Sequence, residues 1–363
     1  MNLYDILNKA TAKPHALSQE ELMFILEIRD EKEMQQLFHA AYGLKLRYTG
    51  KMVSIRGLIE MGNVCAKDCF YCGIRKSNPN VERFQLDREA VLRMSRWAWK
   101  HNFGSIVMQS GEMESEEHTA FVESLLRDIT NMCNGELGIT LSLGEQSEET
   151  LRRWKNAGAH RYLLRIESSS EEIYRAIHPQ NHSFARRVEC LKILRKLDYQ
   201  VGSGVMIGLP GQSAAQLAGD IEFFRKMDLD MIGMGPFLPH HDTPMGKNVD
   251  FSENFRRQQL ELGLKMISAV RLQLHNTNIA STTALEALRN DGRELGLLAG
   301  ANVIMPNITD PEYRKNYKLY ENKPAVNESS DDSIRELTRK VAAIGEEINW
   351  NKRGDSPHYF ARH

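Results

Sequence analysis

The stretch VSIRGLIEMGNVCAKDCFYCGIRKSN, residues 53–78, decides how the rest of this sequence is interpreted. Residues 53–60 are mostly apolar or β-branched and predict a buried strand. Cys65, Cys69 and Cys72 follow with the spacing C-x3-C-x2-C. Three thiolates on one loop can hold three irons of a [4Fe–4S] cluster, which normally has four protein ligands. The pattern therefore predicts a strand that ends in a metal-binding loop and leaves one iron open to another molecule.

Two other interpretations of the cysteine loop stay open at this point. A structural zinc ion takes four ligands, commonly from C-x2-C pairs, and no second pair exists here, although a histidine could complete the set. The three thiols could also be incidental. The other two cysteines, Cys133 and Cys190, lie in helix-like stretches and are interpreted as small buried apolar residues. The odd total of five argues against a disulfide scaffold.

Outward from this stretch, short apolar runs alternate with longer amphipathic ones. The predicted strands span residues 53–60, 105–110, 138–143, 161–167, 201–208, 231–237, 278–283 and 301–306. Strands that alternate with helices predict a parallel sheet with right-handed crossovers. Their number, and their spread over roughly 250 residues, favour an α/β fold of the (β/α)8 TIM-barrel type over an open doubly wound sheet.

The two ends of the chain differ from this pattern. Residues 1–50 predict an N-terminal helical region, in which Ser18 and Glu21 have the spacing of a capping box. Residues 51–325 form the predicted barrel, and residues 326–363 a C-terminal helix followed by a loose tail. The division predicts one large domain with a short helical extension at each end.

Composition excludes several classes of partner for the 363-residue chain. Lys and Arg number 47 and Asp and Glu 48, so a net charge of -1 gives no reason to expect nucleic acid or an anionic membrane. No stretch approaches the ~20 apolar residues that span a bilayer. The N-terminus lacks the apolar core of a secretory signal. We therefore expect a cytoplasmic protein.

Polar and charged residues gather where the predicted strands end, which is where barrel enzymes place their sites. Arg161, Arg165 and Glu167 lie in one predicted strand with the spacing i, i+4, i+6, so all three are expected to point to the same face. Charges inside a barrel are costly unless they bind something charged or one another. By the same alternation, His240 and His241 would face opposite sides of a strand, which favours a loop role over a joint metal site.

Tyr71, before the third cysteine, completes the form C-x3-C-x-aromatic-C, which resembles the radical S-adenosylmethionine (SAM) superfamily. The resemblance implies that SAM binds the open iron of the cluster. It also implies that an electron from the cluster cleaves SAM to a 5′-deoxyadenosyl radical inside a dry lumen.

Segments along nearly the whole chain, among them VMQSGE, LLRIES, GPFLPHHDTP and YKLY, are more specifically similar to the HydE-type maturases. These radical SAM enzymes help to assemble the active-site cluster of [FeFe]-hydrogenase. The resemblance implies an anaerobic enzyme whose substrate is a small organometallic or amino-acid-derived molecule. It implies a reductase or ferredoxin as electron donor, and the maturases HydG and HydF as supplier and acceptor.

The resemblance also implies roles for individual residues. Cys65, Cys69 and Cys72 would bind the cluster. The residues that would contact SAM are Gln109, Ser110, Glu112, Ser142, Arg165, Glu167 and Arg187. The residues that would contact the substrate are Arg56, Thr140, Arg161, Met231, Thr282, Thr283, Tyr317 and Tyr320. The two tyrosines have the i, i+3 spacing of one helix face.

Some residues depart from the HydE pattern. No cysteine follows Cys190, and Ala325 stands where the first cysteine of an auxiliary cluster would fall, so no second cluster is expected. Ile166 and Ser168 replace residues that are frequently His and Thr in that family, which leaves room for a divergent paralogue. A mutase or sulfur-insertion enzyme, like methylornithine synthase or biotin synthase, is therefore an alternative. A non-catalytic iron–sulfur or metal scaffold is another.

Overall fold

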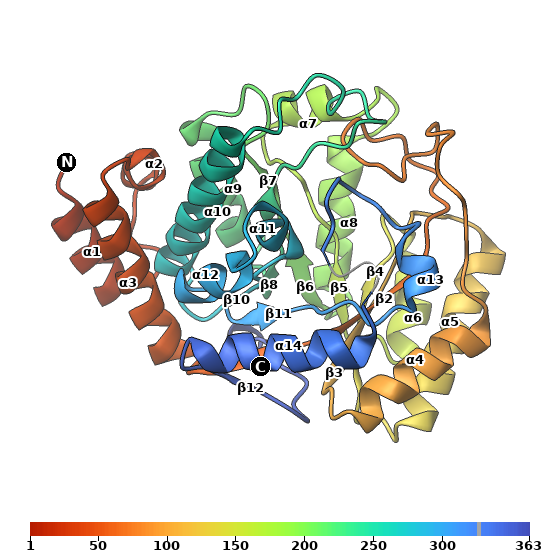
Figure 1. Ribbon diagram of the computed structural model, residues 1–363. Helices are drawn as coiled ribbons and strands as arrows, with labels where there is room; N and C mark the ends of the chain where they lie inside the picture. Colours follow the sequence, from red (N-terminus) through yellow and green to blue (C-terminus); the bar gives the residue numbers. More distant parts are fainter. Residues whose placement is uncertain (325–327) are drawn as a thin grey trace.

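The computed structural model describes residues 1–324 and 328–363, with parallel strands at its centre (Figure 1). A strand occurs in every predicted apolar run. In chain order they are β1 (Met52–Ile55) and β2 (Gly57–Gly62), β3 (Ser105–Ser110), β4 (Gly138–Ser142), β5 (Arg161–Leu163), β6 (Gln200–Ser203), β8 (Met231–Ile232), β10 (Asn278–Ile279) and β11 (Val303–Ile304). β1 and β2 share the first run, which breaks at Arg56.

Parallel pairing carries these strands around a circle. A seven-stranded sheet has the order β10-β8-β6-β5-β4-β3-β2. β10 meets β11 through the bridge Ala280↔Val303, and β11 pairs with β1 through Ser54↔Val303. Because β1 leads directly into β2, the circle closes, and the predicted (β/α)8 barrel is confirmed.

Two predicted strands break into pieces near the end of the barrel where the strands finish, here called the upper end. The run 201–208 divides into β6 and β7 (Met206–Ile207), and the run 231–237 into β8 and β9 (Gly235–Pro236). Gly204 lies at the first break, where a Cβ atom would come within 2.1 Å of the Gly233 carbonyl oxygen. A residue with a side chain would therefore separate the two neighbouring strands.

Helices surround the barrel, and most of them have a capped start and an apolar stripe that faces the strands. Ser115, Ser147 and Ser213, for example, each accept a hydrogen bond from the backbone three residues later. Within the described residues, no helix is both long and apolar enough to cross a bilayer. The surrounding helices are α4 (Arg88–Lys100), α5 (Glu116–Met132), α6 (Glu148–Asn156), α7 (Glu171–Ile177), α8 (Phe184–Lys196), α9 (Ala214–Lys226), α10 (Glu253–Gln273), α11 (Thr283–Leu288), α12 (Gly292–Leu298) and α13 (Pro311–Arg314).

The N-terminal helices α1 (Leu3–Ala12), α2 (Gln19–Glu27) and α3 (Glu31–Tyr48) lie on one side of the barrel, against α9 and α10 (Figure 1). The capping box predicted at Ser18 and Glu21 is present at the start of α2. Lys45 on α3 forms a buried ion pair with Glu346. This pair ties the N-terminal helices to the C-terminal end of the chain.

The C-terminus is not the loose tail that the sequence predicts. After α14 (Ser330–Ala343), β12 (Glu347–Ile348) pairs with β1, and α15 (Pro357–Phe360) follows. The segment between β12 and α15 lies under the lower end of the barrel, where the strands begin. The carbonyl of Gly354 accepts hydrogen bonds from Arg56 and Asn278 there. Side-chain donors from the barrel thus hold the tail in place. No local sequence pattern predicts these contacts, because the partners are far apart in the chain. The predicted boundary at 325/326, with Ala325, lies outside the described residues.

Candidate active site

The upper end of the barrel encloses a cavity of about 690 Å³, lined by residues from many of the strand ends. The three clustered cysteines lie on its wall, together with most of the predicted site residues. The predicted SAM and substrate residues that line it are Gln109, Ser110, Glu112, Ser142, Arg165, Glu167, Arg187, Thr282, Thr283, Tyr317 and Tyr320. The fold thus brings together side chains that are up to about 250 residues apart in the sequence.

The cysteine loop follows β2, and all three of its thiols are free. The backbone N–H groups of Lys67 and Glu112 donate to Cys65 Sγ at 3.4 and 3.3 Å. Burial raises the pKa of the Cys69 thiol to about 12, and burial together with the neighbouring thiols raises the pKa of Cys72. Thiolates gathered in this way need a cationic partner, so the donor set fits an iron–sulfur cluster with three protein ligands.

The backbone around the loop is held tightly. Arg83 donates to the carbonyls of Asn63 at 2.7 Å, Ile74 at 2.8 Å and Arg75 at 2.6 Å, which brackets the three cysteines. Gly111 approaches from the end of β3, where a Cβ atom would come within 2.2 Å of the Val64 carbonyl oxygen. These contacts restrain the backbone on both sides of the three cysteines.

Charged side chains beside the cysteines form a paired network. Lys67 Nζ lies 3.0 Å from a carboxylate oxygen of Glu112 and 3.4 Å from one of Glu145. Arg187 Nε donates to Glu145 at 2.5 Å. Burial raises the pKa of Glu112; it also acts to raise that of Glu145, but Arg187, Lys67 and Arg186 together more than offset it, and the pKa of Glu145 is lowered. The network presents both signs of charge to the cavity, as a zwitterionic ligand requires.

Arg165 and Glu167 face this cavity, but Arg161 does not. Strand β5 ends at Leu163, and Glu167 has a left-handed backbone with φ of 65°. The alternation expected from one continuous strand therefore does not apply, and the predicted common face is wrong. Arg165 Nη2 lies 2.9 Å from a carboxylate oxygen of Glu167 and also donates to the Val205 carbonyl at 2.9 Å.

Arg56, Thr140, Arg161 and Met231 gather around a separate, small cavity at the lower end of the barrel. Arg161 donates to the Thr140 hydroxyl at 3.0 Å and to the Asp355 carboxylate at 2.5 Å. Arg56 donates to the Met231 sulfur at 2.7 Å. The structure brings these four predicted substrate residues together, but beneath the cysteine-lined cavity.

Tyr317 and Tyr320 line the upper cavity, although the helical spacing inferred for them is wrong. The helix α13 ends at Arg314, so both tyrosines lie in an irregular segment. Gln109 donates to the Tyr317 hydroxyl at 3.1 Å, and the Tyr320 hydroxyl donates to Thr283 at 3.0 Å. Thr282 lines the same wall, with its hydroxyl in no hydrogen bond to a described residue.

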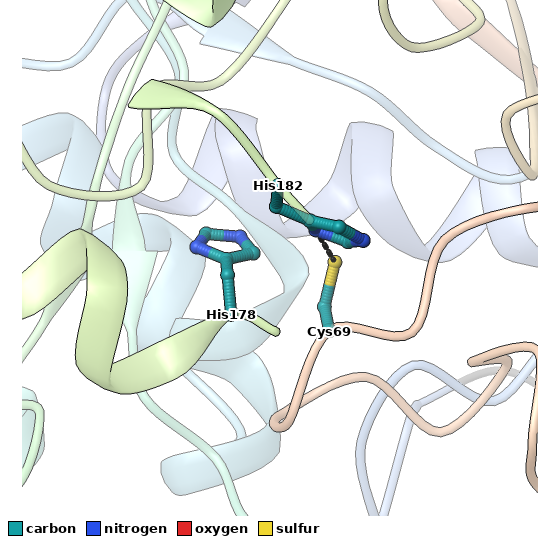
Figure 2. A group of neighbouring side chains, drawn as sticks. All are labelled: Cys69, His178 and His182. Atoms are coloured by element: carbon teal, nitrogen blue, oxygen red, sulfur yellow. Dashed lines mark hydrogen bonds between the residues drawn. The ribbon is translucent and has the colours of Figure 1, made fainter. Parts of the chain in front are cut away.

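His178 and His182 lie behind the cysteine loop (Figure 2). His182 Nδ1 is 3.9 Å from Cys69 Sγ, and the Tyr71 hydroxyl lies 3.3 Å from His178 Nε2. Burial lowers the pKa of His178 to about 3 and that of His182 to about 4, so both rings are neutral at physiological pH. Neither histidine stands in a sequence pattern that marks it as a site residue.

The loop position predicted for His240 and His241 is confirmed, but the expectation that their rings face opposite sides is wrong. They lie in a turn and not in a strand, so their rings stack at 5.0 Å instead of facing opposite sides. Glu321 contacts both rings, and the three side chains could hold a metal ion. Asp242 N–H and Glu321 already provide these rings with partners. The cluster is therefore satisfied without an ion.

Several residues of the site were missed because their sequence context is ordinary. Lys323 forms a buried ion pair with Glu60 on the cavity wall, and Lys67 stands between two of the cysteines. From the sequence alone, Arg83, His178 and His182 resemble ordinary surface residues of loops. Only Lys67 could have been predicted from the sequence, because it lies between Cys65 and Cys69 and must therefore stand beside the cluster-binding thiols. Cys133 and Cys190 are buried in the core, as the sequence predicts, and Ile166 is buried as well.

Known proteins share both the sequence and the fold of this chain. Residues 59–224 match the model of the radical SAM superfamily. The [FeFe] hydrogenase maturase subunit HydE of Thermotoga maritima is 38% identical over 328 residues, which cover 90% of this chain and 91% of that protein. The crystal structure of methylornithine synthase (PylB) superposes with a TM-score of 0.81 at 23% identity, covering 95% of this chain and 98% of the other.

The X-ray structure of the FeFe-hydrogenase maturase HydG from Carboxydothermus hydrogenoformans superposes with a TM-score of 0.80 at 19% identity. It covers 97% of this chain and 81% of that one. At these identities PylB and HydG show a common fold, whereas the similarity to HydE extends through the sequence as well. The chain therefore belongs to the HydE family of radical SAM enzymes.

Proposed function

We propose that this protein is a cytoplasmic HydE-type maturase that acts in the assembly of the [FeFe]-hydrogenase active-site cluster. The observation that carries the proposal is the cysteine loop on the cavity wall, in a chain 38% identical to HydE over nearly its full length. Cys65, Cys69 and Cys72 would hold one [4Fe–4S] cluster. The cluster and SAM, when bound, supply one-electron reductive cleavage of a carbon–sulfur bond and subsequent hydrogen abstraction.

The residues beside the cysteines have the chemistry to bind and orient SAM. Glu112 and Glu167 offer carboxylates to an ammonium or to ribose hydroxyls, while Arg165 and Arg187 offer donors to a carboxylate. Arg165 Nε is buried and has no hydrogen-bond acceptor among the described residues, so a ligand would supply one. Gln109, Ser110 and Ser142 lie on the same wall and would contribute neutral hydrogen bonds.

The substrate would occupy the barrel below SAM. Tyr317, Tyr320, Thr282 and Thr283 provide hydroxyl groups on the cavity wall. Further down, Arg56 Nε and Arg161 Nη2 are buried without a hydrogen-bond acceptor in the described residues. With Thr140 and Met231 they surround a separate cavity of about 10 Å³, which has room for about one water, so their proposed contact with an anionic substrate group requires the floor of the upper cavity to open. A closed lumen would exclude water and so protect a reactive species from side reactions.

The substrate that fits this proposal is a small organometallic iron species derived from an amino acid. HydG would supply it, HydF would receive the product, and a reductase or ferredoxin would deliver the electron. No auxiliary cluster is part of the proposal, because no cysteine follows Cys190.

The test is anaerobic iron–sulfur reconstitution, followed by reduction with dithionite in the presence of SAM and detection of 5′-deoxyadenosine by mass spectrometry. Wild type is expected to form it, Cys69→Ala to lose both iron and turnover, and Cys133→Ala, altered in the buried core, to retain both. Retained turnover in Cys69→Ala would contradict the cluster assignment. Iron binding without SAM cleavage would favour the non-catalytic scaffold.

The hydrogenase-specific part needs a separate assay. The protein should restore hydrogenase activity in a host that expresses the hydrogenase, HydG and HydF but no HydE. Failure to do so, together with SAM cleavage and formation of 3-methylornithine or biotin, would establish the mutase or sulfur-insertion alternative.

A further inference from the structure

His178 and His182, drawn with Cys69 in Figure 2, lie behind the cysteine loop. Their tautomers follow from their hydrogen-bond partners. His178 Nδ1 lies 2.8 Å from the Tyr174 carbonyl oxygen, which can only accept. The proton of His178 is therefore on Nδ1, and its Nε2 accepts from the Tyr71 hydroxyl at 3.3 Å. Both ring nitrogens of His178 are thus used, Nδ1 by the Tyr174 carbonyl and Nε2 by the Tyr71 hydroxyl.

His182 has the same tautomer as His178, set by different neighbours. The backbone N–H of Asp68 donates to His182 Nε2 at 3.5 Å, so this nitrogen carries no proton. In a neutral imidazole the proton must then be on Nδ1. Nδ1 lies 3.9 Å from Cys69 Sγ and is directed at the sulfur, as the dashed line in Figure 2 marks. His182 is therefore a hydrogen-bond donor to a thiolate that would ligate iron.

These tautomers also argue against a separate metal site at Cys69, His178 and His182. The ligand atoms lie within 4.8 Å of one another, as a metal site requires. A metal ion, however, needs an unprotonated nitrogen from each histidine. The protons of both rings are on Nδ1, and both Nε2 lone pairs already accept hydrogen bonds. The arrangement is that of a donor to the sulfur.

We propose that His182 is a positioning residue that raises the reduction potential of the cluster by donating a hydrogen bond from Nδ1 to Cys69 Sγ. The inference rests on the cluster of the proposed function, though not on the hydrogenase substrate. A hydrogen bond to a ligating sulfur withdraws negative charge from the cluster and stabilises its reduced state, which carries the additional electron. The Asp68 N–H belongs to the cysteine loop and donates to Nε2, so the loop itself keeps the His182 proton on Nδ1, the nitrogen nearest Cys69 Sγ.

The experiment is an anaerobic potentiometric titration of the reconstituted enzyme, followed by EPR of the reduced cluster. His182→Leu keeps the size of the side chain and removes the donor. We expect it to disfavour reduction about tenfold, which corresponds to a potential lower by ~59 mV for one electron. His182→Asn places an amide N–H near the position of Nδ1, and its potential should stay within about twofold, or ~18 mV, of wild type. His39→Ala, on the exposed surface of α3, is the control.

The outcomes separate the inference from the proposed function. A wild-type protein that binds no cluster would refute the cluster assignment on which both depend. A normal cluster whose potential is the same in His182→Leu and in wild type would overturn the role of His182 alone. The same holds if His182→Asn shifts as far as His182→Leu, because a structural effect would then explain both.

A second measurement covers the case in which His182→Leu loads no cluster. Wild-type enzyme labelled with 15N-histidine should show a histidine nitrogen coupled to the reduced cluster in pulsed EPR spectra. The coupled proton should also exchange with deuterium. Spectra without a histidine coupling would contradict the hydrogen bond directly.

Discussion

Removing the carboxylate of Asp355 should loosen the C-terminal tail from the lower end of the barrel. Arg161 donates to Asp355 at 2.5 Å and Gln200 donates at 2.8 Å, while His160 Nε2 lies 3.3 Å away. The Arg161 side chain is only 3% exposed. Asp355→Ala would therefore leave the buried Arg161 guanidinium without its counter-charge, next to the small lower cavity that Arg161 and Arg56 both line.

The size of the effect follows from what remains around Arg161. Removal of one partner of a buried pair typically costs about 3–5 kcal/mol. Arg161 keeps the Thr140 hydroxyl and the Arg353 carbonyl at 2.9 Å, and Asp355 itself is 16% exposed. These contacts reduce the cost, so we expect a loss of about 2–3 kcal/mol in the free energy of unfolding. Asp355→Asn should lose less, because its amide oxygen can still accept from Arg161.

The assay is denaturant unfolding of the reconstituted enzyme, with Asp331→Ala as the control. Asp331 is an acidic residue in the first turn of α14 whose side chain is 64% exposed. Burial acts to raise the pKa of Asp355, but His160, Arg161 and Gln200 together lower it below its usual value of 3.8. The stabilisation is therefore present above that value and is lost as the pH falls below it. The difference between wild type and Asp355→Ala should accordingly be constant from about pH 5 to pH 8. Equal stability of the two proteins would refute the role of the tail contact.

Three further changes test other parts of the structure. Gly111→Ala should lower the iron bound per chain, because a Cβ atom there would lie 2.8 Å from Cys65 Cβ; unchanged iron content would show that the loop can move aside. Lys323→Met should destabilise the protein by about 3–5 kcal/mol in thermal or denaturant unfolding, because it leaves the Glu60 carboxylate buried without its ion-pair partner. The double variant Lys323→Met/Glu60→Gln should recover much of this loss. Asp220→Asn should stabilise the protein, because burial raises the pKa of Asp220 to about 7. The gain in the free energy of unfolding should grow from about pH 5 to pH 7 and level off above pH 7. A gain that does not depend on pH would contradict this cause.

Strand order and the cysteine loop could be predicted because both depend on local patterns. The apolar runs alternate with amphipathic stretches, and parallel strands joined by helices have few ways to connect. The C-x3-C-x2-C spacing holds three thiols on one loop whatever the rest of the chain does. Most of the residues expected near SAM follow from the same rule, since residues after parallel strands meet at one end of a barrel.

Tertiary structure alone decided which charged groups face the cavity. Arg161 and Arg165 differ by four positions, yet the early end of β5 and the left-handed Glu167 place them at opposite ends of the lumen. The tail under the barrel and the donor behind Cys69 depend on contacts between segments that are far apart in the chain. His182, for example, lies 113 residues from the sulfur that it faces. Sequence by itself determined the strands and the ligand loop, because their signals are periodic or closely spaced, whereas the environment of each charge required the folded chain.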